Sequence, residues 1–115
     1  MASGFTFDFY TPMEGKDDVL WIAWQERDAI IDRLLALRRA YPDCLKGTEP
    51  ALRLMVSDRA TMVTQNCLFA KKAFAYTAAG QPKEKCMMGA KADCSRCGCI
   101  VPFYLHALTH RTPGP

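Results

Sequence analysis

The sequence predicts an α+β fold in which one β-α unit precedes a small β-hairpin, a cysteine-rich segment and a C-terminal helix. Three observations predict this order: aromatic residues alternate near the N-terminus, a strongly patterned helix follows them, and five of the six cysteines lie within residues 67–99. We therefore expect two parts, residues 1–47 for the β-α unit and residues 48–115 for the hairpin, the cysteines and the last helix.

The first predicted element is a strand over residues 4–11. Phe5, Phe7 and Phe9 alternate there with smaller or polar residues, and Pro12 ends the run. This period of two is typical of a strand that buries one face, so the phenylalanine side chains are expected to pack together against a partner.

The second predicted element is a helix over residues 21–41, which Pro42 closes. Its apolar residues recur at helical spacing on one face, namely Ile30, Ile31, Leu34, Leu35, Leu37 and Tyr41. A single strand has no neighbour to hydrogen-bond with, and a single helix leaves its apolar face uncovered. This unit is therefore expected to need neighbours that the chain does not visibly supply.

The remaining elements are shorter. Residues 51–63 are weakly patterned and predict a short helix or a turn, whereas residues 69–86 predict a β-hairpin. The hairpin is indicated by the alternation of Phe74 and Tyr76, followed by Gly80 and Pro82. The last element is a helix over residues 102–110, with proline in its first turn.

Composition limits the class of protein. The chain has 115 residues, of which 50% are hydrophobic and 23% charged, so it can form one core but not a two-domain enzyme. No segment approaches the roughly 18 uninterrupted apolar residues of a membrane span, and the first residues do not follow the pattern of a secretory signal. We therefore expect a cytoplasmic protein with no membrane association.

Charge divides the chain into two halves. Residues 1–45 hold eight acidic and five basic side chains, whereas the remainder holds four acidic and ten basic ones. Because the basic half also contains most of the cysteines, its charge suggests compensation for clustered thiolates as readily as attraction to nucleic acid.

The cysteines carry the strongest functional signal. Five of them lie within 33 consecutive residues: Cys67, Cys86, Cys94, Cys97 and Cys99. The last three are interspersed with Asp, Ser, Arg and Gly, which is not the pattern of side chains buried on one apolar face. Disulfides, a zinc site and an iron-sulfur cluster are the three chemistries that use such a set.

These three interpretations differ in what they require. Disulfides are disfavoured in the reducing cytoplasm. Zinc favours four ligands in two closely spaced pairs, and here Cys94 and Cys97 form the one such pair. A 4Fe-4S cluster accepts thiolates from scattered positions, so this spacing favours it over zinc. Cys44 lies far from the other five and is expected to be an ordinary thiol.

The cysteine spacing also resembles a known family. Cys67, twelve residues, Gly80, five residues and Cys86 come within one residue of the pattern that opens the SPASM and twitch domains of radical SAM enzymes. The run 92–99 resembles the cysteine-rich tail of those domains. Residues 5–42 look like the last strand and helix of a radical SAM partial barrel.

This resemblance implies a function. The chain would be the C-terminal part of a radical SAM enzyme, with Cys67, Cys86 and two or three of Cys94, Cys97 and Cys99 binding an auxiliary 4Fe-4S cluster for electron relay or substrate positioning. Its implied partners are the rest of the barrel and an electron-donor protein.

One departure from the family concerns S-adenosylmethionine. The Cys-x3-Cys-x2-Cys motif that binds the SAM-cleaving cluster is absent from the sequence, so SAM is implied only for a longer parent chain. The sequence also offers no side-chain set typical of catalysis. The alternative hypothesis is a small zinc-binding module that contacts nucleic acid or a protein.

Overall fold

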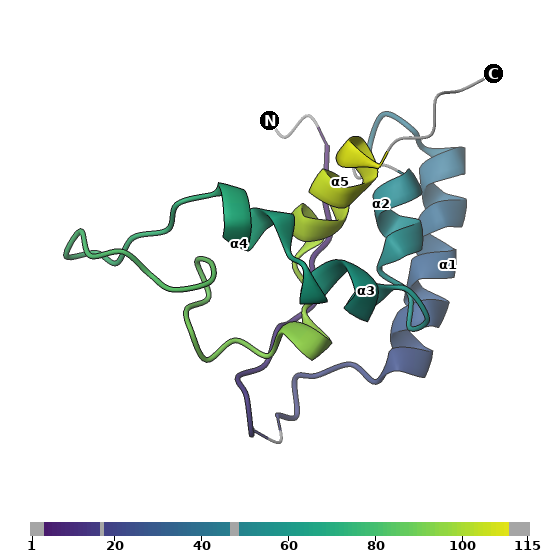
Figure 1. Ribbon diagram of the computed structural model, residues 1–115. Coiled ribbons are helices and arrows are strands. Elements are labelled where there is room, and N and C mark those ends of the chain that lie inside the picture. Colours follow the sequence, from purple (N-terminus) through teal and green to yellow (C-terminus); the bar gives the residue numbers. More distant parts are fainter. Residues whose placement is uncertain (1–3, 17, 47–48, 111–115) are drawn as a thin grey trace.

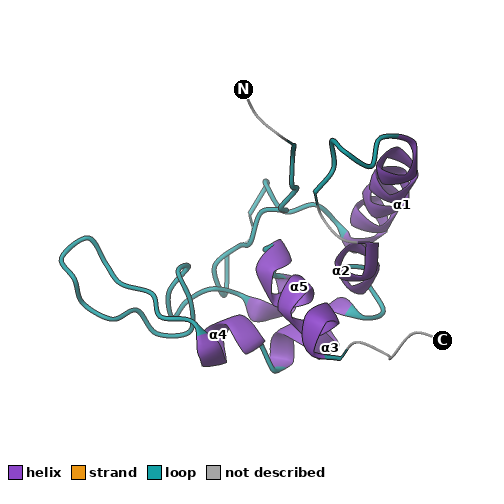
Figure 2. Ribbon diagram, turned by 90° about the horizontal axis from the view of Figure 1, so that it is seen from above, coloured by secondary structure: helices purple, strands orange, loops and turns teal. Residues whose placement is uncertain are grey.

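The computed structural model describes residues 4–16, 18–46 and 49–110, and this part of the chain is built from helices and long loops (Figure 1). The helices are α1 (Trp24–Ala40), α2 (Glu49–Leu54), α3 (Ala60–Gln65), α4 (Leu68–Lys72), the 3-10 helix η1 (Cys94–Arg96) and α5 (Ile100–Thr109). The predicted α+β fold is wrong, because the described residues form no sheet and pair only at isolated bridges (Figure 2).

The core lies where α2 packs against both α1 and α5, while α3 packs against α5 and η1. From α1 it receives Ile31, Leu34 and Leu35, which share one face because they lie three or four residues apart. Side chains buried in this way stabilise the fold by about 1.5–3 kcal/mol each. The other members of the core are Ala51, Leu52, Met55, Ala60, Val63 and Phe103.

The predicted N-terminal strand is an extended segment without a ladder. Phe5 bridges Leu45 in the parallel sense and Met13 bridges Ala92 in the antiparallel sense, so the partner changes along the segment. A sheet needs successive pairs with one neighbour, and no neighbour stays alongside long enough. Phe5 is 60% exposed, so the expected buried phenylalanine face is also wrong, although Phe9 packs against the core.

The predicted hairpin is likewise reduced to one bridge, between Tyr76 and Pro82. Residues 68–72 form helix α4 instead, and the loop that follows extends away from the helices (Figure 1). Phe74 is 86% exposed and Tyr76 is 59% exposed. An isolated two-stranded hairpin is marginal in water, and here no apolar face is buried to support it.

The helices themselves follow the sequence more closely. The helix expected over residues 21–41 is present as α1, the weak region 51–63 overlaps α2 and α3, and the last helix is α5. The expected boundary between 47 and 48 lies outside the described residues, and the core draws on residues from both sides of it. None of the described helices is long and apolar enough to cross a membrane.

Candidate metal centre

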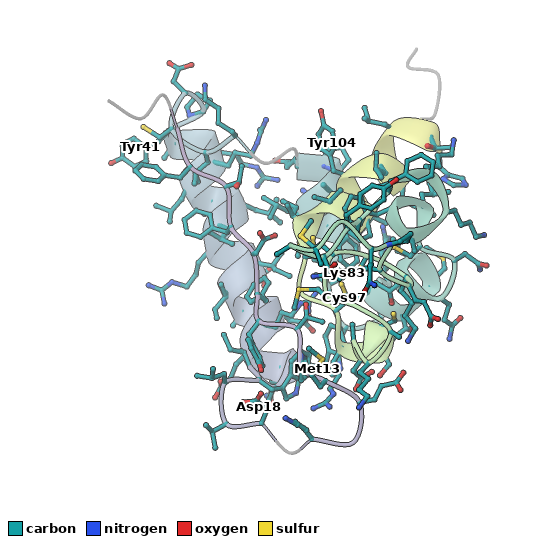
Figure 3. The ribbon with its side chains drawn as sticks, turned by 90° about the vertical axis from the view of Figure 1, so that its left-hand side faces the viewer. Met13, Asp18, Tyr41, Lys83, Cys97 and Tyr104 are labelled. Carbon is teal, nitrogen blue, oxygen red and sulfur yellow. The ribbon has the colours of Figure 1, made fainter. Side chains whose placement is uncertain are left out.

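Five cysteines from separate parts of the chain line one cavity of about 550 Å³. Cys67 stands at the start of α4, Cys94 opens η1, Cys97 ends it, and Cys99 precedes α5. Cys86 comes from the long loop between α4 and η1. Figure 3 shows Cys97 near the middle of the molecule. The structure therefore brings together at one cavity the five cysteines that the sequence singles out, 67, 86, 94, 97 and 99.

Backbone amides approach four of these sulfurs. The Ala70 N–H donates to Cys67 Sγ and the Met88 N–H donates to Cys86 Sγ, both at 3.4 Å. The backbone of Cys99 hydrogen-bonds the Cys97 sulfur, and the backbone of Val101 hydrogen-bonds the Cys99 sulfur. Such donors stabilise thiolate charge, so each turn holds its sulfur in a form suited to a metal ligand.

Burial opposes ionisation of three of the five thiols, those of Cys94, Cys97 and Cys99. Desolvation raises the pKa of Cys97 to about 11, and it also raises the pKa of Cys94 and of Cys99. The charges of Cys67 and Cys86 raise the pKa of Cys94 and of Cys99 further, which reflects how closely the thiols gather. The metal-free thiols of Cys94, Cys97 and Cys99 are therefore neutral at pH 7, and a metal must displace their protons to bind.

The extended N-terminal segment holds the cysteine loop in place. The Phe9 N–H donates to Gly98 O at 2.8 Å, and the Gly98 N–H donates to Thr11 Oγ1 at 2.9 Å. A Cβ at Gly98 would collide with the backbone of Phe9. Glycine is therefore required between Cys97 and Cys99, because only a residue without a side chain lets the two segments approach so closely.

Carboxylates fix both ends of the loop. Asp93 accepts from the Ser95 N–H at 3.0 Å and from Arg96 Nε at 2.7 Å, which caps η1. Asp8 Oδ1 accepts from the Ile100 N–H at 2.7 Å, which satisfies a free amide at the start of α5. Residues distant in sequence thus set the orientation of Cys94, Cys97 and Cys99.

Two basic residues near the cavity make contacts that the sequence does not show. Lys85 lines it, with a left-handed backbone (φ 65°) and Nζ 3.2 Å from Glu14 Oε1. The hydrogen bond to Glu14 raises the pKa of Lys85. The positive charge of Lys85 in turn acts to lower the pKa of Cys94, against the larger effect of desolvation. Arg27 is fully buried and donates to Cys97 O at 2.8 Å. Its position four residues before Ile31 on the buried face of α1 is the signal that could have identified it.

Thiols are the donors that an iron-sulfur cluster takes, and the cavity of about 550 Å³ that the five cysteines line is much larger than a single metal ion needs. A zinc ion lies about 2.3 Å from each of its sulfur ligands and occupies little volume, whereas a cluster fills a cavity between its cysteines. In the described ranges no three Cys, His, Asp or Glu side chains are grouped closely enough to hold a single metal ion. Cys44 is exposed and does not line the cavity.

Comparison of the chain with protein-family models, with curated proteins and with solved structures finds no match.

Proposed function

We propose that this chain binds an auxiliary 4Fe-4S cluster as part of a radical SAM enzyme. The observation that carries the proposal is the gathering of Cys67, Cys86, Cys94, Cys97 and Cys99 around one cavity of about 550 Å³. Cys67, Cys86 and two of the other three would supply the four thiolates that such a cluster takes. When bound, the cluster would relay an electron or hold a substrate.

The chain's own residues contribute more than ligands. Backbone amides at Ala70 and Met88 stabilise the charge of Cys67 and Cys86. Phe9, Phe69 and Met87 line the cavity and would keep water from the sulfurs. The reduction potential of such a cluster depends on hydrogen bonds to its sulfurs and on its exposure to solvent. The backbone amides would supply the hydrogen bonds, and the apolar lining would limit the exposure.

The proposal includes partners. SAM cleavage is assigned to a longer parent chain, since the Cys-x3-Cys-x2-Cys motif is absent here. The partners would be the remainder of that radical SAM enzyme and an electron-donor protein in the cytoplasm.

Zinc binding is the second candidate function. Cys94 and Cys97 lie at the two ends of η1, which forms the tight turn that a pair of zinc ligands needs. In that case the chain would be a small module that contacts nucleic acid or a protein through its basic half.

Anaerobic reconstitution separates the two functions. With ferrous iron, sulfide and thiol, the chain is expected to turn brown and to hold about four irons. A colourless chain that retains stoichiometric zinc and no iron after the same treatment would favour the interaction module.

Two serine variants test the ligand set. Cys86→Ser should lower the iron content, because it removes a thiolate from the cavity, while Cys44→Ser should leave it unchanged, because Cys44 is exposed and does not line the cavity. Iron analysis after reconstitution measures both. Equal losses in the two variants would show that the cavity does not define the ligands.

A further inference from the structure

Arg27 is the largest fully buried side chain of the described residues, with 0% exposure. It lies in the first turns of α1, and its guanidinium carbon is 4.6 Å from the ring centre of Trp24, 4.9 Å from that of Phe9 and 5.9 Å from that of Phe103. Aromatic faces attract cations, so three rings hold this charge inside the protein.

The guanidinium joins the start of α1 to the cysteine loop. Nε donates to Met55 O at 2.9 Å and Nη1 donates to Cys97 O at 2.8 Å, while Nη2 is buried without a hydrogen-bond partner. None of the ion pairs in the described part of the chain includes Arg27. Both of its hydrogen-bond partners are neutral carbonyls, and the neighbouring carboxylate of Asp28 acts on its charge only at a distance.

A buried cation without an anion is costly, and proteins seldom keep one unless something compensates it. Desolvation lowers the pKa of Arg27 to about 10, so the group is still charged at pH 7; the negative charge of a Cys97 thiolate would favour that form, and so does the charge of Asp28. The Cys97 thiol is neutral in the metal-free chain and would become a second source of negative charge beside Arg27 when it binds a metal. A cluster with four thiolates is anionic and would supply a lasting negative charge there.

We infer that Arg27 is the fixed countercharge of the cluster site and the positioning residue for Cys97. This inference rests on the proposed function, which it deepens by naming a residue that controls the cluster. Arg27 would hold the Cys97 carbonyl, and with it the turn that presents the sulfur. Its charge would favour the reduced, more negative cluster, because a nearby cation stabilises added electron density.

The test compares Arg27→Gln with Arg27→Lys in the reconstituted chain. Glutamine removes the charge but keeps a donor, whereas lysine keeps the charge but cannot form both carbonyl hydrogen bonds. Arg33→Gln on the exposed face of α1 is the matched control. The midpoint potential and the rate of iron loss to a chelator are measured for each, after circular dichroism has verified folding.

Arg27→Gln should have a more negative midpoint potential than the unsubstituted chain and should lose iron about 10–100-fold more readily, as is usual when a group that orients a ligand is removed. Arg27→Lys should lose iron faster but keep a potential near that of the unsubstituted chain. If Arg27→Gln does not fold, Arg27→Met replaces it as the neutral variant, because its apolar chain suits the aromatic surroundings.

Each other outcome overturns the inference. A neutral variant with the potential of Arg33→Gln would show that the charge of Arg27 does not act on the cluster. A shift in Arg27→Lys as large as that in the neutral variant would assign the effect to packing alone. If the unsubstituted chain takes up no cluster, the proposed function fails with the inference, whereas the first two results leave the proposed function standing.

Discussion

Gly98 is the residue on which the cysteine loop most depends. The backbone of Phe9 occupies the space that a side chain would need, and the two segments are hydrogen-bonded at this point. Gly98→Ala should therefore destabilise the metal-free chain by about 1–3 kcal/mol, as overpacking does, and should lower iron uptake by moving Cys97 and Cys99. Urea unfolding and iron analysis measure the two effects.

The control for this prediction is Gly80→Ala. Gly80 has a left-handed backbone (φ +81°) with open space around it, and alanine there costs about 1–2 kcal/mol. It does not line the cavity, so iron uptake should be retained. Retained uptake in both variants would contradict the role given to Gly98.

The buried thiols make the stability of the metal-free chain depend on pH. The pKa of Cys97 is raised to about 11 in the folded chain from 9.0, so the unfolded chain releases this proton first. The contribution of the protonated Cys97 thiol to the stability of the folded chain is therefore complete below pH 9 and is lost as the pH rises through 11. The free energy of unfolding is compared at about pH 8.5 and about pH 10.5, near the two ends of that window. It should fall less between these pH values in Cys97→Ser than in the unsubstituted chain. Urea unfolding measures this change, and an equal fall in the two chains would contradict the prediction.

At the scale of elements, the sequence predicts helices better than extended segments. The spacing of Ile31, Leu34 and Leu35 predicts α1, because helical periodicity is local and its buried face needs only one partner. The alternation at Phe5, Phe7 and Phe9 predicts extended backbone, but whether a ladder forms depends on a distant neighbour. No local pattern shows that Phe5 meets Cys44 while Phe9 meets Gly98.

Helix α5 depends on a cap from another part of the chain. Asp8 accepts from the Ile100 N–H at 2.7 Å. Asp8→Ala should destabilise the chain by about 0.5–2 kcal/mol, the usual cost of losing a cap, while Asp8→Asn, which keeps an acceptor oxygen, should cost less. Thermal unfolding followed by circular dichroism measures the difference, and equal losses in Ala and Asn variants would show that the hydrogen bond does not stabilise α5.

For the whole molecule, the sequence misjudged the fold, although the five cysteines that it singles out do line one cavity. Cys67, Cys86 and Cys94 were singled out by their density along the chain, which does not depend on the elements between them. Arg27 escaped because its surroundings, three aromatic rings, are tertiary neighbours. The contact between Lys85 and Glu14 is likewise not visible in the sequence. Ordinary basic residues in sequence carry no sign of such contacts.

The chain alone should not cleave S-adenosylmethionine. That reaction needs a cluster with an open iron, which radical SAM enzymes form with a motif absent here, whereas the described cavity is lined by five cysteines, one more than a fully ligated cluster takes. Anaerobic incubation with SAM and dithionite, followed by chromatography, should yield no deoxyadenosine above the metal-free control. Product above that control would assign an initiating cluster to this chain.

The most direct measurement of the central claim is Mössbauer spectroscopy of the anaerobically reconstituted chain, paired with iron and sulfide analysis. The account predicts one cubane cluster, with about four irons and four sulfides for each chain. The same spectrum should be obtained from Cys44→Ser, whose substituted residue does not line the cavity. Isolated thiolate-bound iron without sulfide, or iron bound equally well after Cys86→Ser, would contradict the claim that the five cysteines gather to hold one cluster.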